Sequence, residues 1–478
     1  MKPIRTDVAS WQNQFVLTRN ASSGPEGWPN RSLGDWHLFT HAVLPVIPVR
    51  GDEGSTIGWL LGWPVCLDSE RILQPEDEFR LGAGTEELYR LGGRWLALLI
   101  GLETVCGDPS GSIAAVYDPV TGVLASTTGL LPPGSKDAEH ASLVDAFNIP
   151  QDDNFYAFGL TAHPQARRLL PNHMLDLRTF EETRFWPGRI GPDVDDTDAV
   201  VDRIIDLVGM QLRAITRQFE LKGNITAGYD TRMILALCRP YARQIRYVTR
   251  DNGKFGDAVD ANTARQIASD NGLDLTIRGD GSASQAELDS WQERTGHCVA
   301  GAVWRSLKTW KDFEPNRSNI TGVFSPLKGY YRTDEPLERF SGRLLVELAK
   351  LPLHPVMERA ADQWLANVRK IPGISQVQVL DLMLIEQRKG CWAAPPFYGS
   401  EDAAPSFWLL SHREIIDLML RLPKAYKLGK CLAVDTIRKA WPELLNYRFN
   451  APSGFSGAPL YLYGAYRLTR SKFRRLMK

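Results

Sequence analysis

A short stretch of small and polar residues constrains the fold of this chain more than any other feature. Residues 224–232 read Asn-Ile-Thr-Ala-Gly-Tyr-Asp-Thr-Arg, between an apolar strand end and an amphipathic helix expected to begin near Thr231. Small residues let backbone N–H groups approach an anion closely, and a helix N-terminus carries partial positive charge. The stretch therefore predicts a strand, a turn and a helix that together bind a polyphosphate.

The side chains of this turn are of the types that phosphate chemistry uses. Threonine hydroxyls hydrogen-bond phosphate oxygens, an aspartate carboxylate holds Mg²⁺, and an arginine adds positive charge. The metal ligand would be Asp230. The candidate nucleotide-contacting residues are consecutive: Thr226, Ala227, Gly228, Tyr229, Asp230, Thr231 and Arg232. An ordinary strand-to-helix turn that binds nothing remains an alternative at this point.

The residues after the turn predict a β-α-β unit. An apolar helix continues from Met233 to Cys238, Pro240 ends it, and Gln244 to Thr249 has the composition of a second strand. A second helix is expected from Asp260 to Leu273, with glycine at its C-terminal cap. Thr249, at the end of the second strand, would then lie near the adenine or ribose of a nucleotide bound at the turn.

The stretch Thr226-Ala227-Gly228-Tyr229-Asp230-Thr231 resembles the PP-loop of the asparagine synthetase family, whose usual form is Ser-Gly-Gly-X-Asp-Ser. The helix that begins at Asp260 follows the second strand in the same order as in that family. The resemblance implies an ATP-binding domain that uses Mg²⁺. It also implies that a substrate carboxylate is adenylated at the α-phosphate with release of pyrophosphate, after which an amine displaces AMP.

The first part of the chain is strand-like from Trp36 to about Pro187. A strand is expected from Thr56 to Cys66. The passages Leu91–Ile100 and Ala114–Gly122 resemble the glutaminase domain that precedes the synthetase domain in the same family. The resemblance implies a β-rich sandwich like that of the Ntn hydrolases.

The resemblance covers most of the chain and implies an α/β protein of two domains. Gly and Pro interrupt a polar segment between Gly188 and Asp196, which places the boundary near residue 190. Residues 1–190 would form the glutaminase-like domain. Residues 191–478 would form the ATP-binding domain, with a parallel sheet and a helical C-terminal part.

One departure from the family changes the expected chemistry. A working glutaminase of this type uses an N-terminal cysteine that is both nucleophile and amine base, whereas position 2 here is Lys2. The first domain is therefore expected to be degenerate and to supply no ammonia from glutamine. β-Lactam synthetases and lasso-peptide cyclases share that loss, which implies an amide or lactam closed with an amine of the substrate.

A second family landmark is altered as well. Residues 320–331 stand where the family carries a loop close to Ser-Gly-Glu-Gly-Ser-Asp-Glu, and Gly322 and Ser325 fit that pattern. Pro326 and Leu327 stand where carboxylates are expected. Lys328 would then neutralise phosphate directly, by an ammonium group rather than by a metal. A solvated loop lysine is the alternative.

The segment Leu380–Trp392 resembles the family helix that carries an acidic residue and an arginine. On this basis Glu386, with Arg388, is expected to line the substrate cleft, although the two side chains of a helix would point about 200° apart. Ordinary ion pairs on a half-buried helix are the alternative. The expected catalytic residues are Asp230, Lys328 and Glu386.

The composition of the chain indicates which classes of partner are not expected. The chain has 56 Lys plus Arg against 56 Asp plus Glu, so no net charge draws it to nucleic acid or to an acidic membrane. It has no apolar signal core at its N-terminus and no apolar run of about 18 residues, which predicts a cytoplasmic protein. The six cysteines form no Cys-X-X-Cys pair, and no metal beyond Mg²⁺ is expected.

The sequence therefore predicts an ATP-dependent ligase that joins a carboxylate and an amine of a small molecule or peptide. Pairing of two copies as a homodimer stays open. The competing hypothesis is a synthetase-like scaffold or nucleotide-binding protein without catalysis, because two family landmarks are lost. A nucleic-acid-modifying PP-loop enzyme fits less well, since basic patches and cysteine pairs are missing.

Overall fold

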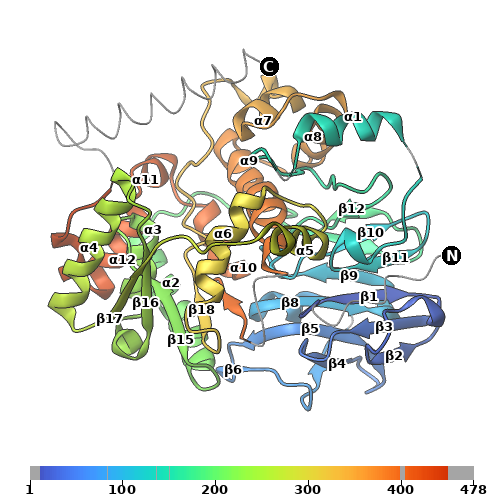
Figure 1. Ribbon diagram of the computed structural model, residues 1–478, viewed down its shortest axis with the longest axis horizontal. Coiled ribbons are helices and arrows are strands. Elements are labelled where there is room, and N and C mark those ends of the chain that lie inside the picture. The colour runs from blue at the N-terminus through green and yellow to red at the C-terminus, as the bar shows by residue number, and fades with distance from the viewer. Residues whose placement is uncertain (1–10, 83, 136, 150, 399–403, 451–478) are drawn as a thin grey trace.

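Three sheets organise the molecule, as the computed structural model in Figure 1 shows. The structure describes residues 11–82, 84–135, 137–149, 151–398 and 404–450. Two sheets are built from strands between residues 15 and 184, and the third, a parallel sheet, from strands between residues 221 and 407. The chain is thus a mixed α/β protein with a β-rich first part, as expected. Lys2 lies outside the described residues.

The first two sheets are largely antiparallel. The six-stranded sheet has the order β12-β10-β11-β1-β3-β2 and the eight-stranded sheet the order β14-β13-β9-β8-β5-β4-β7, with β6 paired to β5. The strands of the first are β1 (Phe15–Thr18), β2 (Asn30–Leu33), β3 (Trp36–Thr40), β10 (Val116–Asp118), β11 (Val123–Ala125) and β12 (Arg167–Arg168). Those of the second are β4 (Val46–Arg50), β5 (Thr56–Cys66), β6 (Arg71–Ile72), β7 (Phe79–Arg80), β8 (Leu91–Leu99), β9 (Thr104–Gly107), β13 (His173–Asp176) and β14 (Glu182–Arg184).

Strands β5 and β8 are apolar on both faces because both faces are covered. The expected strand from Thr56 to Cys66 is confirmed. Alternate side chains such as Leu61 and Leu96 belong to the main hydrophobic core. The intervening ones, such as Leu60 and Ala97, belong to a second core on the other side of the sheet. Alternation between two cores explains why these strands read as nearly continuous apolar runs.

The parallel sheet has the order β17-β16-β15-β18-β19, with β15 in the centre. Its strands are β15 (Leu221–Asn224), β16 (Arg246–Arg250), β17 (Asp274–Arg278), β18 (Ser318–Ile320) and β19 (Ser406–Phe407). The helix α3 (Tyr229–Leu237) connects β15 to β16, and α4 (Phe255–Asn271) connects β16 to β17. The predicted β-α-β unit is therefore confirmed, and Gly272 caps α4 in the left-handed conformation with a φ of +63°.

The remaining helices surround the sheets. α6 lies between the parallel sheet and the antiparallel sheets in Figure 1, and α7, α8 and α9 lie above the antiparallel sheets. A π-helical segment, Leu384–Ala393, continues α9. The helices are α1 (Ala138–Phe147), α2 (Thr197–Thr216), α5 (Gln285–Thr295), α6 (Gly301–Lys311), α7 (Gly342–Ala349), α8 (Pro355–Val368), α9 (Gln376–Met383), α10 (Arg413–Leu420), α11 (Lys424–Leu428) and α12 (Cys431–Ala440).

The main hydrophobic core crosses the expected domain boundary. It contains buried side chains of the antiparallel sheets, such as Phe15 and Leu98, together with those of the C-terminal helices, such as Leu382 and Ile437. Within the described ranges, none of the helices has both the length and the apolar character that crossing a bilayer requires.

Candidate functional site

The turn between β15 and α3 is closed by hydrogen bonds among its own residues. Gly228 is the N-cap of α3, and its backbone N–H donates to Oγ1 of Thr226 at 3.0 Å. The Oγ1 atoms of Thr226 and Thr231 lie 3.1 Å apart and are hydrogen-bonded. Because Gly228 caps the helix, α3 begins at Tyr229, two residues before the expected start. The two threonines that were expected to contact phosphate therefore lie together at the helix N-terminus.

Asp260 occupies a position beside the turn that the sequence did not indicate. Its Oδ1 accepts a hydrogen bond from the backbone N–H of Ala227 at 2.9 Å and another from Nδ2 of Asn450 at 3.3 Å. Burial raises the pKa of Asp260 above its ordinary value, since the charged carboxylate is poorly hydrated there. An anion at this N–H would have to replace Asp260 as the acceptor.

Two of the expected catalytic residues meet directly. Nζ of Lys328 lies 2.6 Å from Oδ1 and 2.5 Å from Oδ2 of Asp230, and both side chains are about one-quarter exposed. Lys328 belongs to the loop after β18, whereas Asp230 is in the first turn of α3. The altered second loop thus supplies an ammonium group to the N-terminal end of α3. Lys328 is thus paired with Asp230, and its expected contact with phosphate stays a prediction.

A second ammonium group lies near Asp230. Lys389, in the π-helical segment, donates from Nζ to the backbone carbonyl of Val323, in the same loop as Lys328. Burial lowers the pKa of Lys389 to about 8, although the charge of Asp230 opposes that shift. Lys389 directly follows Arg388 in the sequence. Its position next to the expected pair of Glu386 and Arg388 is the sequence signal that could have identified it.

Gly322 and Ser325 lie in the loop between β18 and Lys328. A Cβ atom added to Gly322 would lie 3.8 Å from the backbone N of Thr231, so this glycine faces the first turn of α3. Ser325 is half-buried three residues before Lys328. Gly322 and Lys328 therefore place this loop beside the first turn of α3, and nucleotide binding by Gly322 and Ser325 stays a prediction.

Arg232 does not point toward the phosphate position. Its guanidinium donates to the backbone carbonyls of Leu444, Tyr447 and Arg448 and lies 3.7 Å from the ring centre of Phe449. Burial lowers the pKa of this arginine to about 10. The expectation that Arg232 contacts phosphate is corrected: its side chain holds the chain segment that follows α12 against α3.

Glu386 lies in the interior and does not line the cleft. Its carboxylate accepts two hydrogen bonds from Arg184, at 2.5 and 2.6 Å, and further bonds from Trp364 at 2.6 Å and Asn172 at 3.0 Å. Burial raises the pKa of Glu386, but the charge and hydrogen bonds of Arg184 outweigh burial and lower it. The geometry corrects the expected cleft position and matches the alternative of an ion pair. Its neighbour Arg388 stacks on Trp392 at 3.9 Å.

Tyr229 and Thr249 each make contacts next to the turn. The ring of Tyr229 stacks on Phe449 with the ring centres 4.1 Å apart, and Nζ of Lys430 lies 4.8 Å from its centre. Oγ1 of Thr249 donates to the backbone carbonyl of Ile225 at 2.5 Å, which ties the end of β16 to the turn. Of the two, Thr249 also lines the cavity next to the turn.

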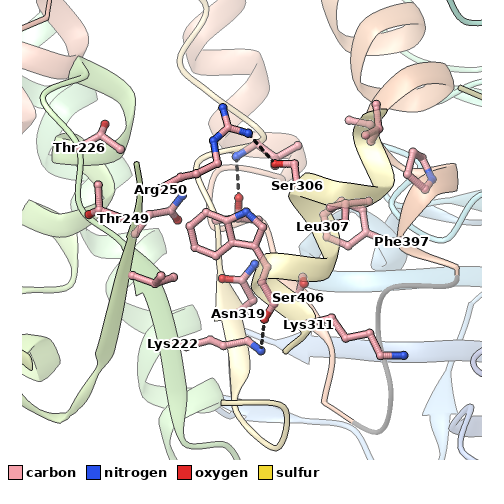
Figure 2. A pocket seen from close by; sticks show the side chains of 18 of the residues that line it. Lys222, Thr226, Thr249, Arg250, Ser306, Leu307, Lys311, Asn319, Phe397 and Ser406 are labelled. Carbon is pink, nitrogen blue, oxygen red and sulfur yellow. Dashed lines mark hydrogen bonds between the residues drawn. The ribbon is translucent and has the colours of Figure 1, made fainter. Parts of the chain in front are cut away.

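A cavity of about 780 Å³ opens beside the turn, between the parallel sheet and α6. Figure 2 shows Thr226, Thr249 and Arg250 toward one side of it and Lys222, Asn319 and Ser406 below them, with Ser306 and Leu307 of α6 opposite. Its volume is in the range of small-molecule sites. The cavity is lined at the sheet by Lys222, Asn224, Val248, Thr249, Arg250, Asn319 and Ser406, with Thr321 just after β18. Elsewhere it is lined by α6, the start of α4, Trp392, Ala393, Pro396 and Phe397.

The sheet face toward this cavity is polar. Lys222 and Asn224 are two residues apart on β15, as are Asn319 and Thr321 at β18, so these side chains project to one side. Tyr247 and Ile320 project to the other side, where they line a small pocket with Ile234 and Leu235 of α3. The backbone of β15 at Gly223 and Asn224 also borders that pocket. Parallel sheets are usually apolar on both faces, so the polar face indicates a binding surface. The sequence did not indicate Asn319 or Ser406, whereas Asn224 is the first residue of the stretch 224–232.

The described residues hold no cluster of three or more His, Cys, Asp or Glu side chains that would bind a metal by protein ligands alone. Asp230, the expected Mg²⁺ ligand, has both carboxylate oxygens in contact with Lys328. A metal would therefore reach Asp230 only by displacing that lysine.

Comparisons with known proteins leave the family of this chain undetermined. No family model matches the chain, and no curated protein matches it. Solved structures with some similarity include an NH3-dependent NAD synthetase from Campylobacter jejuni, at 12% identity, a TM-score of 0.20 and coverage of 39% of this chain and 82% of the other.

Two further structures are similar at the same level. An NMN synthetase from Francisella tularensis has 10% identity and a TM-score of 0.20, with coverage of 43% of this chain and 94% of the other. An NAD+ synthetase from Burkholderia pseudomallei has 14% identity and a TM-score of 0.17, with coverage of 53% and 91%. TM-scores this low carry no argument about fold or function, so the site is interpreted from its own geometry.

Proposed function

We propose that this protein is an ATP-dependent ligase that forms an amide or lactam from a carboxylate and an amine. In the proposed reaction a substrate carboxylate is adenylated at the α-phosphate, pyrophosphate leaves, and attack by the amine releases AMP. One observation carries the proposal: the turn after the central strand of a parallel sheet, the N-terminus of α3 and the ammonium of Lys328 converge beside a large cavity.

The residues at the turn fit a polyphosphate. Thr226 and Thr231 present hydroxyl groups, α3 directs its first N–H groups at the same point, and Gly228 keeps that point free of a side chain. Lys328 would move from Asp230 to a phosphate oxygen, since a charge-assisted contact of either kind satisfies the ammonium. Binding and orientation of the phosphates would supply the catalysis that this chain contributes.

Asp230 would hold the Mg²⁺ that accompanies ATP, with Lys328 displaced from its carboxylate. Mg²⁺ in nucleotide sites is typically held by one or two carboxylates plus the phosphates, so a single aspartate is a sufficient protein ligand. At this site Asp230 would exchange Lys328 for the metal. A site with several fixed protein ligands to the metal would need no such exchange.

The proposal excludes glutamine as the nitrogen source. Four of the six cysteines are buried, and burial raises the thiol pKa of Cys106 and Cys238 to about 12 and that of Cys298 and Cys391 to about 11. Thiols with these pKa values stay protonated near neutral pH and are poor nucleophiles, so these four are unsuited to attack glutamine. Cys66 and Cys431 are half-buried. In the proposed reaction the amine belongs to the substrate.

A non-catalytic nucleotide-binding protein or scaffold is the second candidate, and a specific observation favours it. The N–H of Ala227 is taken by Asp260, the N–H of Gly228 by Thr226, and both oxygens of Asp230 by Lys328. In this turn, the N–H groups and the carboxylate oxygens already have partners within the protein. A site that no longer binds phosphate would show the same pattern.

Calorimetric titration with a non-hydrolysable ATP analogue and Mg²⁺ tests the proposal. A Cβ at Gly228 would lie 3.2 Å from Oγ1 of Thr226, so the branched side chain of Gly228→Val crowds the phosphate position and should abolish binding. Gly188→Val is the matched control, because a side chain there meets open space. Failure of the folded wild type to bind would overturn the proposal. Binding without carboxylate- and amine-dependent pyrophosphate release would select the non-catalytic protein.

A further inference from the structure

The cavity extends along the sheet well beyond the turn, and its inner part differs from its outer part. Lys222 pairs with Asn319 in register, and Asn319 pairs with Ser406, so these three residues form one row across β15, β18 and β19. Asn224 lies two residues further along β15, beside the turn, which separates the two rows by about 7 Å. We call Lys222, Asn319 and Ser406 the inner row, and Asn224 with the neighbouring turn the outer row. A nucleotide bound at the turn would contact the outer row, so the part of the cavity at the inner row would be open to another group.

Lys222, in the inner row, connects the sheet to the end of α6. It is buried, and its Nζ donates to the backbone carbonyls of Trp310 at 2.9 Å, Phe313 at 2.7 Å and Glu314 at 3.0 Å. These carbonyls lie at and just beyond the C-terminal end of α6, where helix carbonyls lack partners within the helix. The lysine thus fixes the end of α6 at a set distance from the sheet. Its three N–H donors are used by these bonds and do not call for an anion.

Asn319 is the group in the inner row that has an unmet hydrogen-bonding need. Its side chain is only 9% exposed, it lines the cavity, and its Oδ1 is buried without a hydrogen-bond partner. Burying an amide atom without a partner costs free energy, so a polar group in the cavity opposite Asn319 would be favoured. Figure 2 shows Asn319 on the sheet near Ser406, facing the space below α6.

The surroundings of Asn319 indicate which group fits. Leu307, Trp310 and Phe397 supply apolar and aromatic walls, so the ligand has an apolar or aromatic body. Arg250, which also lines the cavity, already contacts Asp280 at 3.4 Å and Ser306 at 3.1 Å. Burial of an unpaired charge in such a place is costly, whereas a neutral polar group with matching hydrogen bonds is not.

We propose that the inner part of the cavity binds a neutral primary carboxamide on an apolar or aromatic body, held by the side-chain amide of Asn319. A carboxamide carries a donor and an acceptor side by side, so it pairs with the Asn319 amide in either orientation of that amide. That this carboxamide belongs to the carboxylate or amine substrate rests on the proposed function. Its binding at Asn319 does not.

Titration of the full chain with benzamide and with benzoate, in the absence of ATP, tests the inference. Benzamide has the proposed neutral group on an aromatic ring, and benzoate has the same shape with a negative charge. We expect benzamide to bind the wild type at least about tenfold more tightly than benzoate. Asn319→Leu should weaken benzamide binding about tenfold, since it removes the hydrogen bonds at similar volume. Asn316→Leu, at an exposed position outside the cavity lining, should leave it unchanged.

Asn319→Ala, which removes the side-chain amide without adding a charge, serves where Asn319→Leu does not fold, and it should also weaken benzamide binding about tenfold. Absence of benzamide binding, a preference for benzoate, or an unchanged affinity in the folded Asn319 variants would overturn the inference. The ATP-analogue titration of wild type and Gly228→Val is separate. Loss of nucleotide binding with retained benzamide binding would reject the proposed function alone, and the reverse result would reject this inference alone.

Discussion

Lys328 and Asp230 form an ion pair at the N-terminal end of α3. Both side chains are about one-quarter exposed, so the pair is accessible and is screened more than a buried one. If Lys328 transfers to a phosphate oxygen, Lys328→Met should weaken binding of the ATP analogue by about tenfold or more, because a hydrogen bond to a charged group contributes about 1.5–3 kcal/mol. Calorimetry of the two proteins with Mg²⁺ present measures this difference.

Lys328→Met also tests whether Asp230 binds Mg²⁺. With Lys328 removed, both oxygens of Asp230 become available to Mg²⁺, so the remaining affinity should depend more strongly on Mg²⁺ than in the wild type. Lys424→Met, at an exposed position on α11, is the matched control and should change neither quantity. An affinity that Lys328→Met leaves unchanged would show that the lysine serves Asp230 only.

The helix α6 is held against the parallel sheet from its C-terminal end. In Lys222→Met the backbone carbonyls of Trp310, Phe313 and Glu314 lose the ammonium that satisfies them, and buried acceptors without donors are costly. We expect the free energy of unfolding to fall by about 2–4 kcal/mol. We also expect hydrogen exchange of residues 301–311 to become faster, as mass spectrometry of peptides from this helix would record.

Lys308→Met is the control on the same helix. Lys308 forms ion pairs at 3.2 Å with Glu287 and Asp312, whose side chains are close to half exposed, so its removal should change the stability by about 1 kcal/mol or less. Equal exchange rates of α6 in the wild type and in Lys222→Met would show that the helix is held by its apolar contacts instead.

The elements that local residue patterns determine were predictable from the sequence. Small residues, a strand before them and an amphipathic helix after them are local features, so the turn at Thr226 to Thr231 and the parallel β15 and β16 were expected and are present. The proximity of Lys328 to Asp230 was implied only by the family order of loops. It is realised because β18 lies next to β15 in the sheet.

The directions of several side chains depend on distant residues and were not predictable in this way. Arg232 turns inward because the carbonyls of residues 444–448 need donors, more than 200 positions along the chain. Glu386 is buried because Arg184, in the last strand of the first part, neutralises it. Asp260 was expected to begin a helix, yet α4 begins at Phe255 and brings the Asp260 carboxylate to Ala227. Hydrophobic periodicity carries no information about such pairings.

In the whole molecule, buried polar contacts join the residues before position 190 to those after it. Arg184 pairs with Glu386, Oγ of Ser411 hydrogen-bonds Oγ of Ser110, and Arg94 donates to the backbone carbonyl of Ser406. The main hydrophobic core also contains side chains from before and after residue 190. The main core therefore continues across the boundary expected at residues 190 and 191.

Such an interior should unfold as one unit, and Arg184→Met tests this expectation. Differential scanning calorimetry of the wild type should show one transition, because separating residues 1–190 from 191–478 would expose the carboxylate of Glu386 without its partner. Removing one partner of a buried pair costs about 3–5 kcal/mol, so Arg184→Met should move the whole transition down by a few degrees. Arg178→Met removes exposed ion pairs with Asp176 and Glu103 and should move it little. Two transitions in the wild type, or a shift in Arg184→Met confined to one of them, would mean that the two parts are separate folding units and that their shared core contributes little to stability.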